Sequence, residues 1–187
     1  MKDKRGDSVF YANDNEERII EIYNMYYADV YRFLICFTGN RNDAEDFTQE
    51  VFIRVLHNLP ELNRISNLRA WVMSVAKNVA IDHYRKRRWF VYLSEKVLRN
   101  EKTDEKLPVE CLEIDELKKS VHAAVAKLKP AYRAVVILRG INEFTIKETA
   151  EILQCSEAKV KVNYHRALKE LRRKLNFDTV EVFINAN

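Results

Sequence analysis

Seven lysine and arginine residues lie between Ser156 and Leu175, where Glu157 and Glu170 are the two acids, so this segment carries a net charge of +5. Cationic side chains at this density bind phosphate oxygens and the acceptor groups of guanine. The segment is therefore a candidate binding site for a polyanion. The alternative interpretation is a basic helix face that does no more than contact solvent.

An amphipathic helix is predicted to position these cations. Ser156 is a favourable N-cap, and one apolar stripe recurs at helical spacing, formed by Val160, Tyr164, Ala167, Leu168, Leu171 and Leu175. The opposite face then contains Ala158, Lys159, Val162, Arg166, Lys169 and Arg173. Val162 is apolar and is nevertheless predicted to point outward, as a contact with a thymine methyl group requires.

A short helix is predicted directly before the basic one. Thr145 and Glu148 have the spacing of a capping box, and a tight turn follows at Gln154, where glycine is more usual. A short helix, a turn and a longer basic helix are typical of the helix-turn-helix, whose second helix enters the major groove. A plain helical hairpin is the alternative.

Groups for catalysis or metal binding are not brought together by the sequence. His57, His83, His122 and His165 fall on separate predicted helices, the cysteines 36, 111 and 155 have no metal-ligand spacing, and there is no glycine-rich phosphate loop. We therefore expect no enzyme activity, no metal, no cofactor and no small-molecule substrate.

Composition and charge distribution indicate the fold class. Glycine and proline occur three times each, and 47% of residues are hydrophobic, which favours an all-α protein of two small helical domains joined by a flexible linker. No apolar run is long enough for a membrane span and no signal peptide is present, so we expect a cytoplasmic protein.

Residues 1–60 carry seven bases and eleven acids, a net −4, whereas residues 69–92 carry +5 and residues 113–175 carry +6. The predicted parts are a disordered N-terminus (1–15), a first domain (16–92), a linker (93–112), a second domain (113–175) and a tail (176–187).

In the first domain, a buried helix from Glu16 is expected to end at Gly39-Asn40, and Asn42 is expected to cap a second helix. Leu56 is among the apolar positions assigned to the core side of that second helix. Its outer side is predicted to hold Asp43, Glu45, Asp46, Gln49 and Glu50. Acids in a first turn also complement the helix dipole, so dipole stabilisation and docking of a basic protein both remain open.

A loop over residues 60–67 and a long helix over residues 68–88 follow. This helix ends in four consecutive cations, Arg85 to Arg88, followed by the aromatic residues Trp89, Phe90 and Tyr92. Complementation of the helix dipole accounts for part of this charge, but contact with phosphates is the preferred interpretation.

Three stretches, taken together, resemble the sigma-70 family of bacterial transcription initiation factors, specifically its small extracytoplasmic-function (ECF) class. They are DAEDFTQEVFIRVLHNL (43–59), LRAWVMSVAKNVAIDHYRKRR (68–88) and the stretch from Leu128 to Leu175 that ends in the predicted helix-turn-helix. The recognition helix of the family often reads VKSR, whereas this chain has Val160-Lys161-Val162-Asn163, which leaves the −35 sequence it reads open.

The resemblance implies partners and site residues. Core RNA polymerase, through its β′ and β subunits, would bind Asp43, Glu45, Asp46, Gln49 and Glu50. The −10 promoter element would bind Asn63, Arg64, Ser66, Asn67, Lys77, Asn78, Arg85 and Arg88. The −35 element would bind Ser156, Ala158, Lys159, Lys161, Val162, Arg166 and Lys169. An anti-sigma factor is a further implied partner. The alternatives are a stand-alone helix-turn-helix regulator, which leaves the acidic helix unused, and a helical adaptor with no nucleic-acid role.

Overall fold

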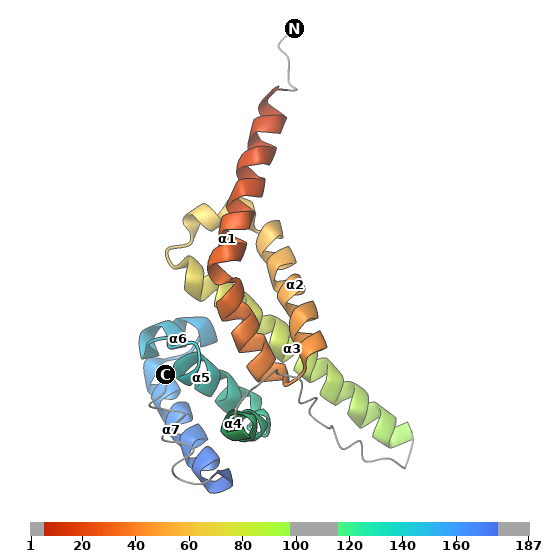
Figure 1. Ribbon diagram of the computed structural model, residues 1–187, viewed down its shortest axis with the longest axis vertical. Coiled ribbons are helices and arrows are strands. Elements are labelled where there is room, and N and C mark those ends of the chain that lie inside the picture. Colours follow the sequence, from red (N-terminus) through yellow and green to blue (C-terminus); the bar gives the residue numbers. More distant parts are fainter. Residues whose placement is uncertain (1–5, 98–115, 176–187) are drawn as a thin grey trace.

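All regular structure in the described part of the chain, residues 6–97 and 116–175 of a computed structural model, is helical. The first part contains α1 (Gly6–Thr38), α2 (Arg41–His57), the 3-10 helix η1 (Leu59–Arg64) and α3 (Leu68–Val97) (Figure 1). The second part contains α4 (Glu116–Ala126), α5 (Pro130–Gly140), α6 (Ile146–Leu153) and α7 (Glu157–Lys174). The predicted all-α fold is confirmed.

The first domain is built around the C-terminal half of α1. Val30, Phe33 and Leu34 are fully buried there because the apolar residues of α1 recur at helical spacing and meet α2 and α3. Val51 and Val55 of α2 and Val72 and Met73 of α3 fill the same core. Burial of such side chains contributes roughly 1.5–3 kcal/mol each.

Several predicted boundaries in this domain are wrong. Helix α1 begins at Gly6 rather than near Glu16, so residues 6–15 are helical where disorder was expected; extending an existing helix adds one hydrogen bond for each residue that is fixed. The N-cap of α2 is Asn40, whose side chain accepts a hydrogen bond from the Asp43 N–H at 3.1 Å, and not Asn42. The end of α1 at Gly39, with φ 69°, is as expected.

The connection from α2 to α3 and the end of α3 also differ from expectation. Residues 60–64, predicted as part of a loop, belong to η1, which Pro60 can start because its missing N–H is not needed in a first turn. Helix α3 continues to Val97, past the predicted start of the linker. The rest of the predicted linker and the whole tail lie outside the described residues, as do residues 1–5.

The second domain is centred on α5, in which every residue from Arg133 to Leu138 is buried. Helix α7 packs along α5 through Val160, Ala167 and Leu171, which confirms the predicted apolar stripe. Helix α6 packs against both α5 and α7. This arrangement holds α7 with its basic face directed away from the core.

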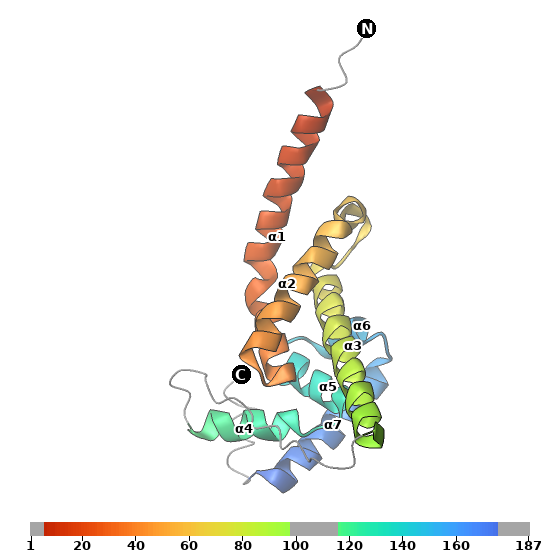
Figure 2. The same ribbon diagram turned by 90° about the vertical axis from the view of Figure 1, so that its right-hand side faces the viewer.

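The two domains contact each other directly: α3 packs against α6, and α1 packs against α4 and α5 (Figure 2). The side chain of Arg133 on α5 donates to the Phe37 carbonyl at 2.7 Å, at the C-terminal end of α1. Asn142 donates to the Asp29 carbonyl at 2.9 Å. Arg69 of α3 pairs with Asp29 at 2.8 Å and lies 4.1 Å from the ring centre of Phe144.

Arg133 is 7% exposed, and we expect its replacement to weaken this arrangement. Besides the Phe37 carbonyl, it donates to the carbonyls of Ala126 and Leu128. Arg133→Met would leave these buried acceptors unpaired, so we expect a loss of about 2–3 kcal/mol in the free energy of unfolding. Urea unfolding measures the loss. Arg166→Met, on the exposed side of α7, is the control, and equal stability of the two variants would contradict the prediction.

Candidate nucleic-acid and protein interfaces

The predicted basic face of α7 is exposed along its whole length. Ala158, Lys159, Lys161, Val162, Arg166 and Lys169 are all exposed, and Val162, an apolar residue, has 46% of its surface in solvent. Ser156 is exposed too, but its hydroxyl already accepts a hydrogen bond from the Lys159 N–H at 3.3 Å as the N-cap. No described part of the chain covers this face, so it is accessible to a DNA groove, and its contacts with bases stay a prediction.

The turn between α6 and α7 sets the angle of this face. The predicted capping box is present: the Thr145 N–H donates to Glu148 at 2.8 Å, and the Glu148 N–H donates to the Thr145 hydroxyl at 3.2 Å. Gln154 adopts the left-handed conformation (φ 52°, ψ 50°) that glycine usually supplies. Tyr164 of α7 lies beside Arg139 of α5, and burial raises the pKa of Tyr164 although Arg139 opposes this.

The capping box makes the stability of this turn depend on pH. The hydrogen bonds from Thr145 hold the pKa of Glu148 below its ordinary value of 4.5, with smaller help from Arg69 and Arg139. Because the pKa is lower in the folded chain, the stabilisation is complete above the unfolded pKa and is lost as pH falls through the folded one. Glu148→Gln should therefore be less stable than the parent protein at pH 7, and this gap should close in acid. Thermal unfolding across pH 3–7, with Glu143→Gln as the control, tests this expectation.

The predicted docking residues of α2 separate into two rows. Asp46 and Gln49 are exposed on the outer row and continue into Ile53 and Leu56, which are 54% and 48% exposed. Leu56 was predicted to face the core, and that prediction is wrong because α1 and α3 cover only the opposite side of α2. Sequence reasoning also missed Ile53, which helical spacing from Asp46 and Gln49 would have indicated.

The second row of α2 faces α3 and is engaged within the protein. Asp43 lies 3.8 Å from Arg87, and Glu50 lies 2.7 Å from His83 and 2.6 Å from Arg54. Burial raises the pKa of Glu50, but the hydrogen bonds and charges of His83 and Arg54 outweigh it and lower the pKa overall. Glu45 pairs with Arg41 at 2.8 Å on the exposed surface. The outer row is therefore the part of α2 whose side chains are available to contact another protein.

The predicted −10 residues before α3 are mostly accessible. Asn63, Arg64 and Ser66 are exposed, and Arg64 pairs with Glu61 at 2.8 Å. Asn67 is half-buried: its side-chain oxygen accepts from the Ala70 N–H at 3.1 Å, and its amide donates to Glu151 of α6 at 3.2 Å.

On α3 itself the predicted −10 residues have different surroundings. Lys77 is 7% exposed, and burial lowers its pKa. Its ammonium donates to the side-chain oxygen of the exposed Asn78 at 2.6 Å. Asp82 and, after it, Cys155 of the α6–α7 turn oppose the lowering of the Lys77 pKa through their charge interactions. In this arrangement Lys77 is buried and Asn67 is hydrogen-bonded to Glu151 of α6, so neither side chain is open to DNA here, and their contacts with the −10 element stay a prediction. Arg85 and Arg88 are exposed.

Within the described ranges, no three His, Cys, Asp or Glu side chains are grouped as a metal site would need. In the same ranges, no helix combines the length and the apolar character that crossing a membrane demands.

The fold and these surfaces define a class of protein: two helical domains, one with a helix-turn-helix that exposes a basic helix, as in DNA-binding proteins of transcription. Comparisons with known proteins narrow the class. The family described as sigma-70 region 2 matches residues 22–90, and the family described as sigma-70, region 4, matches residues 118–171. The chain belongs to the sigma-70 family of RNA polymerase sigma factors, in its ECF class. Sigma factors are not, in general, enzymes.

Individual relatives agree with this assignment. The chain is 35% identical over 165 residues to the ECF RNA polymerase sigma factor SigX of Bacillus subtilis, covering 84% of each chain. It is 32% identical over 181 residues to SigW of the same organism, covering 92% of each. The fold is similar to that of the sigma factor RpoE from Bartonella quintana, solved in complex with the anti-sigma factor NepR (TM-score 0.69, 22% identity, 87% of this chain and 99% of that one).

Proposed function

We propose that the chain directs core RNA polymerase to promoters through three surfaces. The outer row of α2 docks on the polymerase, the residues around η1 and the first half of α3 bind the −10 element, and α7 binds the −35 element. The observation that carries the proposal is the opposite charge of two exposed helices: α2 of the first domain exposes acidic and amide side chains, and α7 of the second domain exposes basic ones. A cytoplasmic location is part of the proposal, because polymerase and promoter are found there.

The physical basis of this function is multivalency. Each domain alone offers a small, charged surface for DNA, and such contacts weaken steeply with salt. A polymerase that holds both domains at a fixed spacing converts the second contact into an intramolecular event with a high effective concentration. Capture of unpaired −10 bases would then offset an opening cost of a few kcal/mol per base.

Separation of the two domains is a required step in this proposal. As long as Asn67 is hydrogen-bonded to Glu151 and Lys77 is buried, the −10 surface is incomplete. The polymerase would supply the free energy for separation by binding both domains in an open arrangement. An anti-sigma factor is a further proposed partner, and it would act by favouring an arrangement in which these surfaces stay covered.

Run-off transcription tests the proposed function. Purified core polymerase with this protein should give transcripts from a matching promoter, and either component alone should give none. The isolated protein should bind promoter duplex weakly, with affinity that falls as salt is raised. Tight, sequence-specific duplex binding without polymerase, together with no transcript in its presence, would instead support a stand-alone helix-turn-helix regulator.

A further inference from the structure

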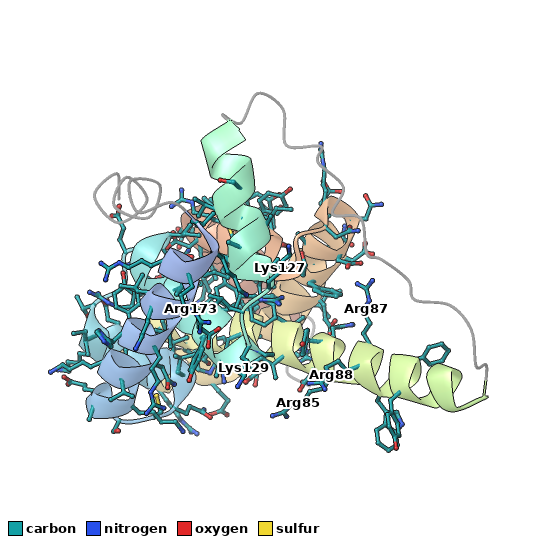
Figure 3. All side chains as sticks on the ribbon, turned by 90° about the horizontal axis from the view of Figure 1, so that it is seen from below. Arg85, Arg87, Arg88, Lys127, Lys129 and Arg173 are labelled. Atoms are coloured by element: carbon teal, nitrogen blue, oxygen red, sulfur yellow. The ribbon has the colours of Figure 1, made fainter. Side chains whose placement is uncertain are left out.

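A group of exposed cations lies where the two domains meet. Two of them come from α3, two from the junction of α4 and α5, and one from the last turn of α7. Figure 3 shows them on one side of the molecule, and we name the set the interdomain cation patch: Arg85, Arg88, Lys127, Lys129 and Arg173. Arg87, also labelled in Figure 3, lies 3.8 Å from Asp43 of α2 and is not a member.

Direct contacts hold these three elements together. The guanidinium of Arg133 on α5 lies 5.6 Å from the ring centre of Tyr84 on α3, and it donates to the two carbonyls that flank Lys127. The side chain of Lys174 donates to the Lys127 carbonyl at 3.3 Å, which joins the end of α7 to the end of α4. Arg88 follows Tyr84 by one helical turn and so lies on the same side of α3. Because its members belong to both domains, the patch is divided when the domains separate.

The fold does not account for this concentration of charge. The structure shows no member of the patch in an ion pair with a described residue. Arg173 lies at the C-terminal end of α7, where the helix dipole favours a cation, but Lys129 is the N-cap of α5, where the dipole disfavours one. Arg85 and Arg88 lie well before the end of α3 at Val97. Like charges repel one another, so the patch opposes the contact between the domains unless an anion offsets the repulsion.

We propose that the interdomain cation patch binds inorganic polyphosphate, and that this ligand favours the closed arrangement in which the two domains contact each other. Polyphosphate is a flexible chain with negative charge on every phosphate, so it can follow cations that three helices present. Because the patch is complete only in the closed arrangement, the ligand binds that arrangement more tightly and shifts the equilibrium toward it. The proposed function assigns no ligand to the free protein, so this inference goes beyond it.

The surroundings of the patch favour a chain held by charge alone over an acidic protein segment. Protein partners are commonly anchored by apolar or aromatic side chains in pockets. Leu128, between Lys127 and Lys129, is 2% exposed and offers no such anchor. On α3 the exposed ring of Trp89 follows Arg88. A nucleic-acid strand or an acidic peptide would pack on this ring, whereas polyphosphate has no apolar surface, so Trp89 distinguishes the occupants.

Isothermal titration calorimetry tests the binding step. It uses the full-length protein and short-chain polyphosphate, without polymerase or DNA, so that its outcome is independent of the run-off experiment. Lys127→Gln combined with Lys129→Gln should weaken binding by at least about tenfold, since two charge-assisted contacts are lost. Lys159→Gln combined with Lys161→Gln removes the same charge from α7 outside the patch; it is the matched control and should change affinity less than about threefold. Trp89→Ala should bind as the parent protein does.

Amide hydrogen exchange tests the effect on the domains. Helix α6 packs against α3 across the interface and contains no member of the patch. Polyphosphate should therefore slow exchange in α6 of the parent protein, and it should do so far less in the variant that combines Lys127→Gln with Lys129→Gln.

Four outcomes would overturn the proposal. Absence of binding would remove the ligand. Equal weakening by the control pair on α7 would place the chain on that helix instead, and a comparable loss in Trp89→Ala would assign the patch to a nucleic acid or a protein. Bound polyphosphate with unchanged exchange in α6 would show that the ligand does not act on the contact between the domains.

Discussion

Arg166→Glu should reduce transcription from a −35-dependent promoter by at least about tenfold while core binding is unchanged. Arg166 is exposed on α7, on the same face as Lys159, Val162 and Lys169. Reversing its charge removes a contact worth roughly 1–3 kcal/mol and adds repulsion toward phosphates. Run-off transcription measures the first effect, and the affinity for fluorescently labelled core polymerase measures the second.

A matched control separates the recognition face from general charge on α7. Arg172→Glu makes the same change on the exposed last turn of α7, outside the predicted reading face, and should alter transcription far less. If Arg166→Glu lowered core affinity and transcription equally, the reading face would have been assigned to the wrong side of the helix.

Asp46→Lys should lower the affinity for core polymerase by at least about tenfold without changing the stability of the chain. Asp46 is exposed on the outer row of α2, beside Gln49 and Ile53, and the structure shows it in no ion pair with a described residue. A reversed charge in the centre of a charge-complementary interface costs several kcal/mol. Titration of labelled polymerase measures the affinity, and circular dichroism with thermal unfolding measures the fold.

Position on α2 is important for this experiment. Glu50→Lys is unsuitable, because Glu50 is paired with His83 and Arg54 and its loss would also destabilise the domain. Glu21→Lys is the appropriate control, since Glu21 is an exposed acid of the same domain on α1. Unchanged core affinity of Asp46→Lys would remove the docking function from the outer row.

The sequence by itself determined much of the local structure of the second domain, whereas several helix boundaries of the first domain were predicted wrongly. The capping box of Thr145 and Glu148, the Ser156 cap, the apolar stripe of α7 and the outward position of Val162 all follow from contacts within a few residues or from the 3.6-residue period. These signals are read along one helix and need no knowledge of its neighbours. The charge blocks along the chain and the order of the helices were determined in the same way.

The tertiary structure decided which faces remain free. Periodicity gives the direction of a face relative to its own helix axis, but the neighbours that cover it come from distant parts of the chain. Helix α3 therefore divides the acidic residues of α2 into a paired row and an exposed row, and Leu56 is left in solvent. The pairing of Asn67 with Glu151, 84 residues away, depends on how two domains meet, for which the sequence carries no local signal.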